Sequence, residues 1–145
     1  MSQIPNGLYT IGKYEPSQLI TLLSDDKMAV FLPPIGNPGE REWVVQRSRD
    51  GAHTIEHPKS GKYLSFEGDP EVNKPIIVAD QPKEWELRQS ARPQTFHLVV
   101  PGGPVQGDQE LALDLSLLRI FPPQLALRPL NQSNDREAWH FQSRE

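Results

Sequence analysis

The sequence contains no cysteine, and this absence excludes several kinds of structure and chemistry. Without cysteine the chain has no disulfide bonds, no thiol nucleophile and no thiolate ligand for zinc. It also lacks a basic segment followed by an apolar core near its start, and no window approaches the roughly 20 apolar residues of a membrane helix. We therefore expect a cytoplasmic protein whose fold is stabilised by packing and hydrogen bonds.

Neither sign of charge dominates the sequence. The 145 residues include 15 basic and 19 acidic side chains, and the net charge of −4 is spread along the chain without a basic block. Neither nucleic acid nor a membrane is therefore an expected partner. The motifs Gly-x-Ser-x-Gly and His-Glu-x-x-His and a glycine-rich phosphate loop are all missing. We expect a protein that is not an enzyme and that uses no cofactor.

The four histidines are the remaining candidates for metal ligands. His53 and His57 have the four-residue spacing of a metal-binding pair on a helix. They fall in a predicted strand that ends before Pro58, so a surface or capping role is the better interpretation. His97 and His140 lie beside phenylalanines in predicted strands, where we expect half-buried packing residues. No metal site is predicted.

Prolines and glycines are abundant, at 15 and 10 residues, and they divide the chain into short segments. Apolar and alternating segments recur between these turn signals at intervals of about 8 to 12 residues, which is typical of a barrel or sandwich of strands. The predicted strands are 7–11, 19–23, 28–32, 41–45, 52–56, 62–66, 75–79, 83–87, 95–100, 111–117, 124–128 and 138–142. The sequence therefore predicts an all-β protein of twelve strands.

An internal repeat narrows this prediction to one fold. Trp43, Trp85 and Trp139 each follow charged residues, and the period of about 45 residues divides the strands into three units of four. Three such units close one barrel and leave no open sheet edge, so we predict a β-trefoil with pseudo-threefold symmetry. The expected repeats cover about 7–48, 52–90 and 95–143 of a single domain, 1–145. We expect the tryptophans on the last strand of each repeat, in the core near the axis.

The segment between the second and third predicted strands is Ser24-Asp25-Asp26-Lys27, and Lys27 is its one basic residue. From the residues alone, a solvated side chain at the end of a hairpin is the simpler interpretation of Lys27.

The opening residues 6–11 (NGLYTI), the lack of cysteine and the ending AWHFQSRE over 138–145 resemble the mushroom β-trefoil protease inhibitors. This group comprises serine protease inhibitors of the cospin and cnispin type and, more distantly, the cysteine protease inhibitors called mycocypins. The resemblance implies a fungal defence protein, or a regulator of endogenous proteases, that acts as a monomer on a trypsin-like serine protease.

The resemblance also implies where the protease binds. Cospin-like members use a basic residue between the second and third strands, so Lys27 is expected in the primary specificity pocket and Lys27–Met28 as the scissile bond. A lysine gains a charge-assisted hydrogen bond to the aspartate of that pocket. The flanking loop is Ser24, Asp25, Asp26 and Ala29. The two aspartates would repel a protease or, as hydrogen-bond acceptors, would stiffen the loop.

A second inhibitory site is implied by the cnispin-like members, which use a basic residue late in the third repeat. Arg128 and Arg136 are the nearest candidates, and Pro129 would resist cleavage after Arg128.

Two other functions remain open. A carbohydrate-binding lectin of the ricin type carries Gln-x-Trp repeats, but the three tryptophans here follow Arg-Glu, Lys-Glu and Glu-Ala. A mycocypin-like inhibitor of cysteine proteases would use the loops 13–17 and 33–40, and the asparagine that some members present to asparaginyl proteases is absent from 57–61. An interaction scaffold without a protease target is the remaining interpretation.

Overall fold

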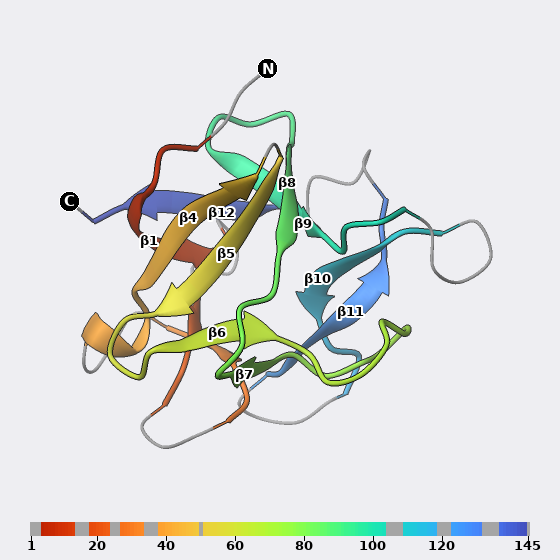
Figure 1. Ribbon diagram of the computed structural model, residues 1–145, viewed down its shortest axis with the longest axis horizontal. Helices are drawn as coiled ribbons and strands as arrows, with labels where there is room; N and C mark the ends of the chain where they lie inside the picture. The colour runs from red at the N-terminus through yellow and green to blue at the C-terminus, as the bar shows by residue number, and fades with distance from the viewer. Residues whose placement is uncertain are drawn as a thin grey trace.

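The computed structural model describes residues 4–13, 18–23, 27–33, 38–49, 51–103, 109–118, 123–131 and 137–144. Its elements are short strands and one 3₁₀ turn (Figure 1). They are β1 Gly7–Gly12, β2 Leu19–Thr21, β3 Val30–Leu32, η1 Pro38–Glu40, β4 Trp43–Arg49, β5 Ala52–His57, β6 Lys62–Ser65, β7 Ile77–Ala79, β8 Trp85–Gln89, β9 Thr95–Val99, β10 Leu111–Leu115, β11 Leu125–Pro129 and β12 Trp139–Ser143. No helix among these residues is long and apolar enough to cross a membrane.

Half of the strands close into a barrel. Antiparallel pairs join β1 to β4, β4 to β5, β5 to β8, β8 to β9, β9 to β12, and β12 back to β1. The first and last strands therefore lie side by side (Figure 1). The other strands form the hairpins β2–β3, β6–β7 and β10–β11. This arrangement confirms the predicted β-trefoil of twelve strands in three four-strand repeats.

Backbone hydrogen bonds join the three hairpins into a hairpin triplet. The amide of Val78 donates to the carbonyl of Lys27 at 2.7 Å, and the amide of Phe31 donates to the carbonyl of Pro123 at 2.9 Å. The amide of Ile76 donates to the carbonyl of Leu125 at 3.0 Å. The inner edges of the hairpins are therefore satisfied by one another, as buried backbone groups require.

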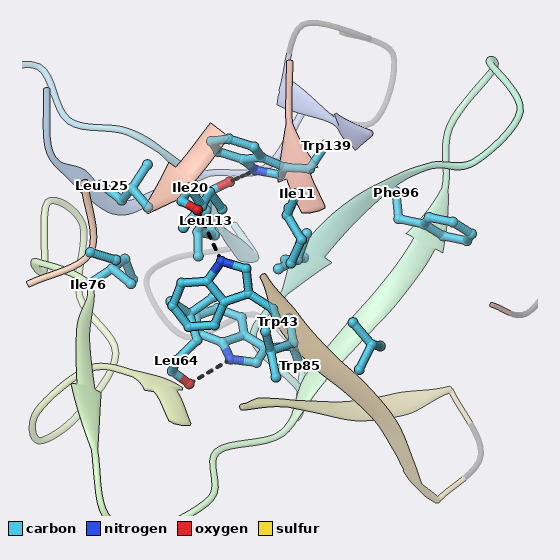
Figure 2. Close-up of a cluster of buried hydrophobic side chains, with 14 of the residues drawn as sticks. Ile11, Ile20, Trp43, Leu64, Ile76, Trp85, Phe96, Leu113, Leu125 and Trp139 are labelled. Atoms are coloured by element: carbon cyan, nitrogen blue, oxygen red, sulfur yellow. Dashed lines mark hydrogen bonds between the residues drawn. The ribbon is translucent and has the colours of Figure 1, made fainter. Parts of the chain in front are cut away.

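The three tryptophans lie where the sequence predicts. Each is fully buried and begins the last strand of its repeat. Each indole Nε1–H also donates to a carbonyl on the second strand of the same repeat: Trp43 to Ile20 at 3.0 Å, Trp85 to Leu64 at 3.0 Å, and Trp139 to Leu113 at 2.9 Å (Figure 2). These bonds satisfy a polar group that would otherwise be costly to bury.

The predicted surface position of His53 and His57 is wrong, because both side chains are buried in β5. The ring of His57 packs edge-on against Trp43 at a centroid distance of 5.0 Å, and its Nδ1 lies 3.1 Å from the hydroxyl of Ser60. Neither nitrogen of His53 has a hydrogen-bond partner among the residues that the structure describes. His97 is fully buried rather than half-buried, whereas His140 is half-buried as predicted. No group of three metal-ligating side chains occurs among the described residues.

Candidate functional site

The tryptophan hydrogen bonds define equivalent positions in the three repeats, because Ile20, Leu64 and Leu113 accept the same bond. The next residue along the chain is Thr21 in the first repeat, Ser65 in the second and Asp114 in the third. The third repeat alone has a carboxylate at this position.

The partner strands of the hairpins show the same departure from symmetry. The tryptophan-bonded residues pair with Phe31, Val78 and Leu127. The residue after each of these is Leu32, Ala79 and Arg128, respectively. Arg128 lies diagonally across from Asp114 on the same face of the β10–β11 hairpin, since Arg128 pairs with Ala112, two residues before Asp114.

A lysine from the first repeat completes this charged region. Lys13 follows β1, and its side chain is only 8% exposed. Its ammonium lies 3.7 Å from Asp114 Oδ1, donates to the carbonyl of Ala138 at 3.2 Å, and lies 4.0 Å from the ring centroid of Trp139. Burial lowers the pKa of Lys13 to about 8, against the attraction of Asp114 and Glu137.

The two carboxylates of the region are held differently. Asp114 Oδ1 accepts from the amide of Leu115 at 2.8 Å, and Glu137 Oε1 accepts from the amide of Asn131 at 2.9 Å. Burial raises the pKa of both carboxyl groups, although Lys13 opposes the shift at Asp114. No described residue donates a hydrogen bond to Asp114 Oδ2, and the Asp114 side chain is 23% exposed. Asp114 therefore offers one acceptor oxygen to a ligand.

Arg128 is positioned by a neighbouring repeat. Its Nη1 donates to Asn73 Oδ1, and the amide of Asn73 donates to the carbonyl of Leu127 at 2.7 Å. Asn73 has a φ of 70°, a left-handed conformation that few residues other than glycine and asparagine adopt. We call Lys13, Asp114, Arg128 and Glu137 the third-repeat cluster.

The structure places the predicted reactive-site lysine outside this cluster, on the β2–β3 hairpin. The side chain of Lys27 is 61% exposed, and its ammonium lies 3.6 Å from Glu67 Oε2. Its carbonyl, however, accepts the triplet bond from Val78, Met28 forms a β-bridge with Ile77, and Ala29 is buried. The backbone at Lys27–Met28 therefore belongs to the triplet, and a protease would have to replace the Val78 bond.

The other predicted inhibitory residues divide into two groups. Arg128 lies in β11, where it pairs with Ala112 of β10, and its inhibitory role stays a prediction. Ser24, Asp25, Asp26 and Arg136 lie outside the described residues, as do parts of the loops 13–17 and 33–40. Their roles, and that of Lys27, stay predictions.

Lys13, Asp114 and Glu137 were not predicted as site residues from the sequence. The sequence offers one indication of Asp114. In the alternating segment Leu111–Leu117, Asp114 occupies the position at which the other two repeats have a hydroxyl residue. That comparison needs the tryptophan bonds to align the repeats, because the loops between the second and fourth strands differ in length.

No protein-family model and no curated protein sequence matches the chain. Solved structures do match it. The ricin B-like lectin of Macrolepiota procera in complex with lactose has a TM-score of 0.79 and 22% identity, covering 98% of this chain and 99% of that one. The designed threefold-symmetric protein ThreeFoil has a TM-score of 0.77 and 16% identity, covering 94% of this chain and 99% of that one. The Rhizoctonia solani agglutinin has a TM-score of 0.76 and 14% identity, covering 99% of both chains.

These similarities define the class of protein by its architecture: the chain is a β-trefoil. They support the fold implied by the resemblance to mushroom inhibitors but give no support to the inhibitor type, since none of the three structures is described as a protease inhibitor.

Proposed function

We propose that this protein binds carbohydrate through the third-repeat cluster. The observation that carries the proposal is that Asp114 Oδ2 accepts no hydrogen bond from a described residue. Asp114 is also the one carboxylate among the three equivalent positions. Similar β-trefoils include a lectin in complex with lactose, which makes a saccharide the first ligand class to consider.

The chemistry of the cluster suits a sugar. Hydroxyl groups both donate and accept hydrogen bonds, so Asp114 Oδ2 can accept from one hydroxyl while the Arg128 guanidinium donates to a neighbouring oxygen. Hydrogen bonds to ionised groups are about twice as strong as neutral ones. The barrel and the triplet hold both side chains in place, which reduces the entropy lost on binding.

We infer binding without catalysis. Asp114 is held beside the Lys13 ammonium, and one oxygen of Glu137 is occupied by the Asn131 amide. Neither carboxylate is therefore poised as a free proton donor opposite a nucleophile, as glycoside hydrolysis requires.

A glycan array followed by titration calorimetry tests the proposal. Asp114→Asn preserves the shape of the side chain but replaces the ionised acceptor, so we expect affinity to fall about 10-fold or more. Ser65→Ala, at the equivalent position of the second repeat, is the matched control and should bind as the wild type does. Thermal unfolding verifies that both variants fold. Unchanged affinity of Asp114→Asn would contradict the proposal.

Inhibition of a trypsin-like protease is a second candidate, favoured by the exposed side chain of Lys27. Titrating trypsin with wild type, Lys27→Ala and Lys59→Ala tests it, because Lys59 is an exposed lysine on the β5–β6 turn. If Lys27 enters the specificity pocket, only Lys27→Ala loses inhibition. A wild type that does not inhibit trypsin would end this candidate.

A further inference from the structure

Arg128 is a cation held in place by a neighbouring side chain, a feature that carbohydrate binding in general does not require. It is the one cation at its position, because the equivalent residues are Leu32 and Ala79. Its guanidinium is held by Asn73 in a left-handed backbone conformation. Asparagine adopts this conformation more readily than most other residues, so the turn that holds Arg128 suits the residue found there.

The backbone on both sides of this contact is also fixed. The amide of Asn73 donates to the carbonyl of Leu127 at 2.7 Å, and the amide of Leu127 donates to the carbonyl of Lys74 at 2.9 Å. The loop after β6 is therefore bound to β11 at the residue that precedes Arg128. Arg128 is consequently preorganised by two repeats.

Within the part of the chain that the structure describes, Asn73 occupies only a small part of the hydrogen-bonding capacity of Arg128. A guanidinium has five N–H donors in a planar fork, and Arg128 Nη1 donates to Asn73. No other hydrogen bond or ion pair joins Arg128 to a described residue. The fork geometry matches a carboxylate, which it binds through two parallel hydrogen bonds.

The cluster holds two cations and two carboxylates, and Arg128 attracts both Asp114 and Glu137 without donating a hydrogen bond to either of these described residues. Lys13 pairs with Asp114, and Glu137 accepts from the amide of Asn131. A carboxylate on the ligand would accept from the N–H donors of Arg128 that Asn73 leaves unused, while a hydroxyl group on the same ligand would donate to Asp114 Oδ2.

We propose that the ligand of the third-repeat cluster is an acidic saccharide, in which a carboxylate is bound by Arg128 and a hydroxyl group by Asp114. The inference rests on the proposed function and adds the ligand class. A simple carboxylate without hydroxyl groups satisfies only half of the site, and so does a neutral sugar.

Calorimetry at about 0.15 M salt with paired probes tests this assignment. The pairs are lactose with 3′-sialyllactose and galactose with galacturonate, and acetate reports binding of a simple anion. For at least one pair, we expect the acidic member to bind the wild type about 10-fold more tightly, since bidentate charge-assisted bonds add to the neutral contacts. Acetate should bind far more weakly than either acidic sugar.

Two variants test whether Arg128 causes the preference for the acidic sugar. Arg128→Leu introduces the residue of the equivalent position 32, and it should bring the acidic and neutral members within about twofold of each other. Arg128→Lys retains the charge without the fork and should keep only part of the preference. Arg92→Leu, which removes an exposed arginine from the β8–β9 turn, should bind as the wild type does.

The outcomes separate the inference from the proposed function. Equal binding of the acidic and neutral sugars by the wild type, or a preference that survives in Arg128→Leu, overturns the inference alone. If no sugar binds, both the inference and the proposed function fail. Acetate binding as strong as that of the acidic sugars would assign the site to simple anions and also overturn the inference.

Discussion

The indole Nε1–H of Trp139 donates to the carbonyl of Leu113 at 2.9 Å, one residue before Asp114. The same bond in each repeat joins the last strand to the second strand of that repeat, which is the first strand of its hairpin. In the third repeat this bond fixes the strand that presents the carboxylate, and the face of the same indole packs against the Lys13 ammonium. One buried side chain thus links the core of the fold to the third-repeat cluster.

Removing this bond should destabilise the protein. Trp139→Phe keeps an aromatic ring but leaves the Leu113 carbonyl unsatisfied, so we expect a loss of about 1–3 kcal/mol in the free energy of unfolding. Urea denaturation monitored by circular dichroism measures it. Trp43→Phe should give a loss of similar size, because it removes the equivalent bond to Ile20. A change of less than about 0.5 kcal/mol in both variants would show that these bonds contribute little.

The buried histidines should make the protein less stable in mild acid. Burial lowers the pKa of His53, with a smaller contribution from Arg47, and burial also lowers the pKa of His57. The folded protein therefore takes up these protons at a lower pH than the unfolded chain, whose histidines titrate near pH 6.5. The unfolded chain binds more protons below that pH. The stabilising contribution of His53 and His57 to the free energy of unfolding is therefore complete above about pH 6.5, and it is lost as the pH falls toward their lowered pKa values in the fold.

Urea unfolding between about pH 5 and 8 measures this dependence. His53→Gln lacks one titrating ring, so the variant should lose less stability than wild type between about pH 6.5 and 5. Equal pH slopes for the two proteins would show that His53 is protonated as readily in the fold as in the unfolded chain.

The ammonium of Lys13 should titrate near pH 8, well below the ordinary value of 10.5, because its side chain is buried. The ¹³Cε chemical shift of Lys13 followed from pH 6 to about 11 measures this value directly. Asp114→Asn should move the midpoint lower still, because Asp114 favours the charged form of Lys13. A midpoint above about pH 10 would place Lys13 in water rather than under the indole of Trp139.

Much of the fold could be predicted because its signals are local. Alternating apolar residues such as Leu111, Leu113 and Leu115 predict a strand from a few neighbours, and the three tryptophans mark the repeat. The strand ends are less predictable: Leu23 and Met28 were expected in β2 and β3 but lie beyond them.

The third-repeat cluster could not be predicted in the same way, because packing rather than sequence spacing assembles it. Lys13 and the carbonyl of Ala138 are 125 residues apart and meet only because β1 pairs with β12. Asn73 and Arg128 are 55 residues apart and belong to different repeats. The histidines show a further limit, since histidine occurs both in cores and at surfaces, and nothing near His53 in the sequence indicates that it is buried.

The most direct measurement of the central claim is an amide NMR titration of the wild type with the saccharide that binds most tightly on the array. Binding at the third-repeat cluster should shift the amides of Leu115 and Asn131, which donate to Asp114 and Glu137, and the amide of Asn73, whose side chain holds Arg128. The amide of Val78, which donates to the carbonyl of Lys27, should stay unchanged. Shifts centred on Val78 and Lys27 with none at Leu115 and Asn131, or no shifts with any saccharide, would contradict the account.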